Sequence, residues 1–355
     1  MEPYCRIYMS SAKGKTVVAR APGRVNLIGD HTDYTGGLVL PMAIDRYTTV
    51  AGQALDGAIR LTSEQLHEPL ALNLPVADAA NVMPAWGRYV AGVANEMGCT
   101  VGIEGSVTTT IPIGAGLSSS AALEVATALA LGSTLSVTEL AQLCRRAEHV
   151  ATGVPCGIMD QLTSAAGVDG HALLIDCHTL DIEPIDLTNN MQVVVQWVAA
   201  RTLVGSAYAD RVAQCAQAEK EIGPLRLASV AETNQIADAV VRARALHVVS
   251  ENERVRQAAK CLQAGDVQGF GLLMNESHES LRNNFAVSTE QMDDAVKQAQ
   301  ALPGVYGARM TGGGFGGCIV MVADADAPIA TSDSVWKVRA VSRAALHPHG
   351  EAFAE

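Results

Sequence analysis

Within ten residues near the start of the chain, four side chains could bind a polar ligand or move a proton: Arg24, Asp30, His31 and Asp33. Burying such groups together is costly unless a ligand or a partner satisfies them. Carboxylates and an imidazole can bind adjacent hydroxyls, and an arginine can neutralise charge on a phosphoryl group in transfer. The alternative interpretation is a solvated loop held by a local side-chain turn.

A second segment, residues 112–122, is rich in glycine and serine. It lies between a strand expected over residues 105–111 and a helix expected over residues 119–131. Glycines let the backbone curl around an anion, and the N–H groups at a helix N-terminus point toward it. The sequence contains no Gly-x-x-x-x-Gly-Lys-Ser/Thr motif, so this is not a Walker phosphate loop. A serine-rich helix cap after a flexible turn is the alternative.

Two carboxylates follow. Glu148 lies near the end of a helix that a capping box at Ser136 should begin and Gly153 should end. A glutamate there opposes the helix dipole, and a divalent cation would offset this cost. Asp160 lies in an apolar stretch and could orient or deprotonate a substrate hydroxyl. Alternatively, Asp160 caps a helix that starts near Gln161.

The fourth segment, residues 312–317, has five glycines in six positions. Such density allows another group to approach the backbone closely, although a mobile hairpin is the alternative. Short strands are expected on either side, over residues 306–310 and 318–322. No acidic residue follows at the spacing of a dinucleotide-binding site.

The elements around these segments predict an α+β protein. A strand over residues 16–21 should reach a turn at Pro22 and a polar loop that extends to about Asp45. Further expected elements are strands over residues 171–175 and 192–198, and helices over most of residues 209–302 with a break at residues 265–266. The expected domain border lies between Asp186 and Gln192.

Composition narrows the class of protein. The chain has 355 residues, too many for one ordinary core, and its net charge of −12 argues against a nucleic-acid surface. Eight scattered cysteines without a Cys-x-x-Cys pair indicate reduced thiols rather than a zinc site or a disulfide framework. The N-terminus has no signal core, and no apolar run is long enough to cross a bilayer. We therefore expect a cytoplasmic protein without a membrane partner.

The four segments, in this order, resemble the GHMP kinases, and within them the galactokinase branch. The motifs are GRVNLIGDHTDY at 23–34, GLSSSA at 116–121, CGIMDQ at 156–161 and MTGGGFGGC at 310–318. The resemblance covers about residues 16–322. It implies an N-terminal domain (1–188) like domain 2 of ribosomal protein S5 and a ferredoxin-like C-terminal domain (189–355). The active site should lie in the cleft between them.

The resemblance also implies an activity: transfer of phosphate from ATP, with Mg²⁺, to the anomeric hydroxyl of galactose, by a monomer. Asp160 would be the catalytic base and Arg24 would stabilise the transition state. The implied sugar ligands are Asp30, His31, Thr32, Asp33 and Tyr208. The implied triphosphate ligands are Gly114, Ala115, Gly116, Leu117, Ser118, Ser119 and Ser120. The implied Mg²⁺ ligands are Ser120 and Glu148.

One position departs from the family, which normally has Glu where this chain has Asp30. The carboxylate is therefore set back by roughly 1.5 Å. A bridging water could restore the contact, or the enzyme could prefer a related sugar of the arabinose or N-acetylgalactosamine type. A silent galactose and ATP sensor is a further alternative, which the complete serine loop and both carboxylates disfavour. Trp86 and Tyr89 are candidate adenine contacts or core residues.

Overall fold

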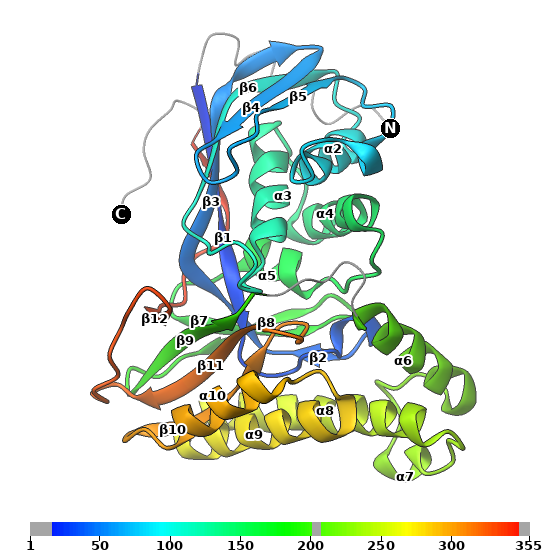
Figure 1. Ribbon diagram of the computed structural model, residues 1–355, viewed down its shortest axis with the longest axis vertical. Helices are drawn as coiled ribbons and strands as arrows, with labels where there is room; N and C mark the ends of the chain where they lie inside the picture. Colours follow the sequence, from blue (N-terminus) through cyan, green and yellow to red (C-terminus); the bar gives the residue numbers. More distant parts are fainter. Residues whose placement is uncertain (1–15, 201–206, 348–355) are drawn as a thin grey trace.

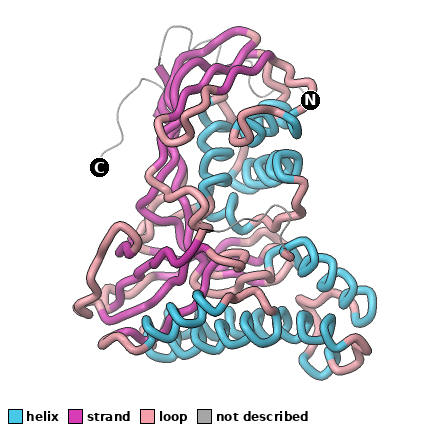
Figure 2. Tube along the Cα trace, viewed as in Figure 1, coloured by secondary structure: helices cyan, strands magenta, loops and turns pink. Residues whose placement is uncertain are grey.

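The computed structural model describes residues 16–200 and 207–347 (Figure 1). An upper lobe, built on a tall sheet, stands on a lower lobe with a second sheet and a layer of helices beneath it (Figure 1). Helices and strands form separate layers in both lobes (Figure 2). The predicted α+β class is therefore confirmed.

The upper sheet has six strands in the order β13-β1-β3-β6-β4-β5. The pair β4–β6 is parallel and the other pairs are antiparallel. The strands are β1 (Thr16–Asn26), β3 (Pro41–Asp56), β4 (Ala58–Ser63), β5 (Leu70–Asn73), β6 (Val101–Thr109) and β13 (Ala345–His347). The helices beside this sheet are α2 (Gly87–Glu96), α3 (Ser119–Ala130), α4 (Val137–Thr152) and α5 (Met159–Ala166), with the 3-10 turn η2 (Ala79–Asn81) before α2.

The lower lobe contains a four-stranded sheet in the order β10-β11-β9-β12 and a small sheet in the order β2-β7-β8. Their strands are β2 (Leu38–Val39), β7 (His171–Asp176), β8 (Ile182–Asp186), β9 (Met191–Ala199), β10 (Val305–Thr311), β11 (Gly317–Asp324) and β12 (Val335–Val338). The helical segments are η1 (Asp33–Thr35), α6 (Tyr208–Ile222), α7 (Val230–Thr233), α8 (Ala239–Gln263), α9 (Val267–Ser280), η3 (Leu281–Phe285) and α10 (Glu290–Gln300). None of the helices within the described ranges is long and apolar enough to span a membrane.

The four-stranded sheet joins two hydrophobic cores. Side chains alternate between the faces of a strand. Val193 and Val195 of β9 accordingly pack into a cluster that includes the core of the upper lobe and also residues of α8 and α9. Val194 of β9 and Ile319 of β11 pack on the opposite face, against the lower helices. One hydrophobic cluster therefore includes residues of both lobes.

Strand β1 continues through the turn predicted at Pro22. That prediction is wrong, because a shift of register between Pro22 and Arg24 accommodates the proline without ending the strand. Glycine is required at position 23, since a Cβ there would lie 2.7 Å from the carbonyl oxygen of Leu117. The strand therefore touches the serine-rich loop at this point. The expected polar loop is also shorter than predicted, because β3 begins at Pro41.

Other expected elements are confirmed. The helix expected over residues 119–131 is α3. The capping box of Ser136 begins α4, and Gly153, in a left-handed conformation, ends it. The two strands around the glycine cluster are β10 and β11, which form an antiparallel hairpin.

The end of the described chain returns to the upper lobe. Ala340 forms an isolated bridge with Ile44 of β3, and β13 pairs with β1. The last described strand of the expected second domain, residues 189–355, therefore pairs with the sheet of the first. The reason is that β1 would otherwise be an edge strand with unpaired backbone groups, and β13 covers that edge.

Candidate active site

The ends of four elements meet at one cavity of about 730 Å³ between the lobes. Arg24 comes from β1, the serine-rich loop leads into α3, Glu148 lies in the last turns of α4, and Asp160 lies in the first turn of α5. Ser118, the N-cap residue of α3, is left-handed and makes no side-chain cap. The first N–H groups of this helix therefore have no side-chain acceptor at the cap, which suits an anion.

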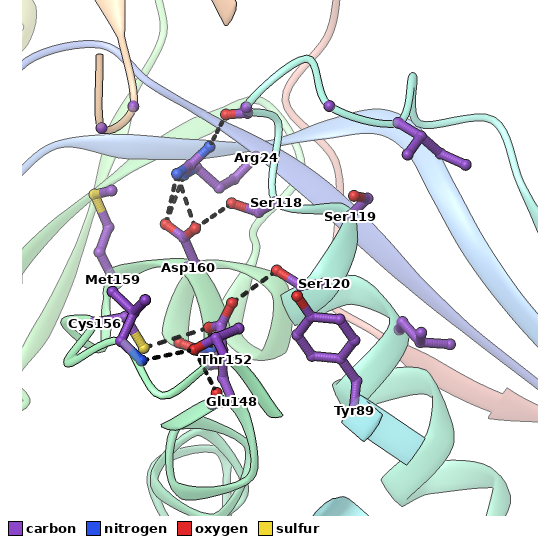
Figure 3. A pocket seen from close by; sticks show the side chains of 18 of the residues that line it. Arg24, Tyr89, Ser118, Ser119, Ser120, Glu148, Thr152, Cys156, Met159 and Asp160 are labelled. Atoms are coloured by element: carbon purple, nitrogen blue, oxygen red, sulfur yellow. Dashed lines mark hydrogen bonds and ion pairs between the residues drawn. The ribbon is translucent and has the colours of Figure 1, made fainter. Parts of the chain in front are cut away.

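Arg24 and Asp160 form an ion pair in the cavity wall (Figure 3). Arg24 Nε donates to Asp160 Oδ1 and Nη2 donates to Oδ2, each at 2.8 Å. Arg24 Nη1 also donates to the carbonyl oxygen of Gly116 at 2.6 Å. The hydroxyl of Ser118 donates to Asp160 Oδ2 at 2.5 Å. The carboxylate is thus fixed in one orientation beside the serine-rich loop. Because α5 starts at Met159, the helix-cap alternative for Asp160 is wrong.

Ser120 and Glu148 form a second polar group in the same wall (Figure 3). Ser120 Oγ donates to Glu148 Oε1 at 2.9 Å, and Gln161 Nε2 donates to Glu148 Oε2 at 2.6 Å. Gln161 Nε2 also lies 3.1 Å from Glu124 Oε2. Burial, and then the charge of Glu148, raise the pKa of Glu124 well above its ordinary value. Burial, and then Asp160, raise the pKa of Glu148.

The loop between β1 and β2, residues 27–37, is called the signature loop below and supplies a third group of polar side chains to the cavity. His31 has a φ of 67°, which is unusual for a residue with a side chain, and its Nδ1 lies 3.0 Å from the Tyr34 hydroxyl. Its ring lies 5.5 Å from that of Tyr208, centroid to centroid. Asp33 lies beside Gly157, where a Cβ would come within 1.8 Å of Asp33 Oδ2. Burial and the charge of Asp160 raise the pKa of Asp33 to about 7.

Asp30 is tied into the protein wall. Arg309, whose side chain is fully buried, donates to Asp30 Oδ2 at 2.5 Å, and the backbone N–H of Gly312 donates to Oδ1 at 3.0 Å. Burial raises the pKa of Asp30, while Arg309 opposes that shift. Asp30 still lines the cavity, but both oxygens already have partners.

Most residues expected at the site line this cavity. These are Arg24, Asp30, His31, Asp33, Gly114, Gly116, Ser118, Ser119, Ser120, Glu148, Asp160 and Tyr208. Three others do not. The Thr32 hydroxyl donates to the carbonyl oxygens of Gly29 and Leu38, so it stabilises the loop instead. Ala115 and Leu117 turn their side chains into the core, so only their backbone could contact a ligand.

Comparisons with known proteins agree with this geometry. Family models match residues 4–54 (galactokinase galactose-binding signature), 86–168 (GHMP kinases N terminal domain) and 258–335 (GHMP kinases C terminal). The human galactokinase is 43% identical over 327 residues, covering 86% of this chain and 83% of the relative. The chain belongs to the galactokinase family.

Other members of the galactokinase family support this placement. The Roseiflexus sp. (strain RS-1) galactokinase is 44% identical over 328 residues, covering 87% of this chain and 83% of its own. A crystal structure of Lactococcus lactis galactokinase complexed with galactose superposes with a TM-score of 0.84 at 30% identity, covering 94% and 95% of the two chains. A mevalonate kinase structure at 20% identity, with a TM-score of 0.66 over 92% and 99%, shares the fold. The two-domain GHMP kinase fold is therefore confirmed.

Three contributors to the galactokinase-family site were not predicted from the sequence. Arg309 lies in the strand expected over residues 306–310 and was not singled out, yet it is the partner of Asp30. Gln161 joins two carboxylates, although it was considered only as a helix start. Gly157 leaves room for Asp33. Gln161 and Gly157 lie inside the motif at 156–161, which was their sequence signal, whereas Arg309 lies just before the motif at 310–318 and its partner is 279 residues away.

Proposed function

We propose that this galactokinase-family enzyme transfers the γ-phosphoryl group of ATP to the anomeric hydroxyl of galactose, giving galactose 1-phosphate and ADP. The observation that carries the proposal is the Arg24–Asp160 pair, which lies in one cavity between the signature loop and the serine-rich loop. A sugar hydroxyl bound there would have a proton acceptor beside it. The galactose complex of the Lactococcus lactis relative supports this choice of sugar.

Asp160 acts as the base in this mechanism. Its carboxylate accepts the proton of the anomeric hydroxyl while the sugar oxygen forms a bond to the γ-phosphorus and the bond to the ADP oxygen breaks. Arg24 and Ser118 hold the carboxylate in place through three hydrogen bonds. The guanidinium of Arg24 also stabilises negative charge as it develops on the phosphoryl oxygens. Because such transition states are loose, orientation contributes much of the acceleration.

The serine-rich loop and the α3 N-terminus bind the triphosphate in this proposal. Gly114 and Gly116 expose backbone to the cavity, and the helix N-terminus favours an anion. The base of ATP takes the apolar end of the cavity. Apolar side chains that line the cavity include Leu66, Trp86, Tyr89, Val107, Ile113 and Leu123. The aromatic rings of Trp86 and Tyr89 offer surfaces for adenine.

The residues present fit a magnesium ion. Ser120 and Glu148 offer hard oxygen ligands at the cavity wall. A cation would offset the cost of burying the charged carboxylate of Glu148. Within residues 16–200 and 207–347 no three His, Cys, Asp or Glu side chains group to form a metal site. This agrees with an ion held mainly by phosphates and water. When bound, Mg²⁺ would neutralise phosphate charge.

We further propose that one chain suffices for activity, because both lobes of a single chain form the cavity. Residues 1–188 and 189–339 form the two domains, with β13 returning to the first. A cytoplasmic location is supported by Cys144, Cys156, Cys177, Cys215 and Cys261, none of which forms a disulfide. Cys5 lies outside the described residues.

The test is a panel of sugars with ATP. Purified protein is assayed for acceptor-dependent release of ADP with galactose, arabinose and N-acetylgalactosamine, and the product is located by phosphorus NMR. We expect galactose to give the highest kcat/KM and a phosphate on C1. Binding of galactose and ATP without ADP release would instead indicate a sensor. A preference for another sugar would refute the choice of galactose but not the reaction.

A further inference from the structure

A π-helical turn, η3, follows helix α9 and lies beside the signature loop. Such widened turns occur frequently at functional sites. The turn ends at Phe285, and the next residue, Ala286, is left-handed with a φ of 54°. The Phe285 ring lies 4.6 Å from that of His31, centroid to centroid. Phe285 is fully buried and does not line the cavity, so it cannot touch a substrate itself.

Two buried arginines hold this turn in place. Arg211 donates to the carbonyl oxygens of Phe285, at 2.7 Å, and Ala286, at 2.9 Å, while Arg244 donates to that of Asn284. The last carbonyls of a helix lack intrahelical donors and carry partial negative charge, which arginines satisfy. Gln214 Oε1 accepts from both guanidinium groups, which orients them. Desolvation lowers the pKa of both arginines. Buried charges of this kind are retained only where hydrogen bonds compensate them, so the position of Phe285 is well determined.

His31 needs such support. Its left-handed backbone is costly for a residue with a Cβ, and strain of this kind persists only when the surroundings determine it. Tyr208 packs against the His31 ring, and Arg211, which follows one turn later on α6, holds Phe285. One helix face therefore supplies both a ring contact and the clamp.

We propose that Phe285 is the positioning residue for His31, and that Arg211 and Arg244 hold it in place. The inference rests on the proposed function, because it assigns His31 to sugar binding. The ring of Phe285 fixes the imidazole against one wall, so that the sugar meets a preformed site. Galactose affinity then depends on residues that never contact the sugar, while nucleotide affinity does not.

The test compares two matched substitutions. Phe285→Met and Phe270→Met both remove a fully buried ring, and Phe270 lies in α9 without a ring contact to His31. Binding of galactose in the absence of ATP, and of a non-hydrolysable ATP analogue, is measured by calorimetry. We expect Phe285→Met to weaken galactose about tenfold, the upper range for loss of an aromatic pair, and to leave the analogue unchanged. Phe270→Met should lower thermal stability and change neither affinity.

Two further variants separate positioning from general damage. In Arg211→Lys the fork that grips two carbonyls is lost while the charge remains, so galactose affinity should fall as in Phe285→Met. Combining Phe285→Met with His31→Ala should weaken galactose no further than His31→Ala alone, because Phe285 acts through His31. Additive losses, or unchanged galactose affinity in both Phe285→Met and Arg211→Lys, would overturn the proposal. Wild-type protein that fails to bind galactose would instead refute the proposed function, and this inference with it.

Discussion

Replacing Asp160 with asparagine tests the mechanism most directly. The amide has nearly the same shape, but it cannot take a proton from a hydroxyl at neutral pH. Its oxygen can accept at most two of the three hydrogen bonds that the carboxylate now receives from Arg24 and Ser118, whereas its NH₂ group can accept none. The substitution thus removes the proton acceptor while the cavity keeps its shape.

Asp160→Asn should have two effects, a loss in kcat and a loss in thermal stability. Loss of a positioned base costs about two to four orders of magnitude in kcat. Arg24 is 5% exposed in its side chain and would lose its charged partner. Breaking a buried pair costs roughly 3–5 kcal/mol, and we take about 3 kcal/mol because the Asp160 side chain is 28% exposed. For 355 residues this corresponds to a fall in Tm of about 4 °C. ATP should restore part of that loss, since its phosphates supply the missing negative charge.

The assay combines steady-state kinetics, calorimetric galactose binding and thermal unfolding with and without ATP. The control is Ser118→Ala, which removes one hydrogen bond from Asp160 but leaves its charge. It should lower kcat far less than Asp160→Asn does. If Asp160→Asn binds galactose normally and turns over near the wild-type rate, Asp160 is not the base and the mechanism fails.

Three further predictions concern the groups around this pair. Glu148→Gln should raise the Mg²⁺ concentration that gives half-maximal rate by at least about tenfold, which is measured by magnesium titration at saturating ATP and contradicted by an unchanged midpoint. Asp33 has a pKa raised to about 7, and sugar hydroxyls prefer its charged form, so galactose affinity should fall as pH drops through 7. If galactose affinity in Asp33→Asn changes with pH in the same way, Asp33 is not the group that causes the change. Gly157→Ala puts a methyl group 1.8 Å from Asp33 Oδ2 and should lower kcat/KM by about a hundredfold. Gly153→Ala serves as a comparison, because its Cβ has open space around it and the substitution introduces backbone strain alone.

The sequence predicted correctly the helix ends that capping residues define. The capping box at Ser136 and the left-handed Gly153 bound α4 as expected, because these caps act within one turn. The prediction of a turn at Pro22 was wrong because the structure there depends on a distant strand. Its strand is held by pairing with β3, and a tertiary partner overrides a local breaking signal.

The motifs in the sequence predicted which residues belong to the site but not which residues they contact. Residue types within the motifs marked Arg24 and Asp160, but their contact joins positions 136 residues apart along the chain. The partner of Asp30 was not predicted, because Arg309 is 279 residues away and nothing local distinguishes it from any other strand residue. The direction of a side chain could not be predicted from the sequence either. Thr32 was therefore assigned to the pocket, although its hydroxyl donates to backbone carbonyl oxygens instead.

The pairing of β13 with β1 has a consequence for biosynthesis. The strand that delivers Arg24 is synthesised before all the other described strands, whereas its outer neighbour β13 is synthesised after them. Until then β1 presents a free edge to other nascent chains, an opening for mispairing. The sheet of the upper lobe therefore cannot be completed before the lower lobe has been synthesised.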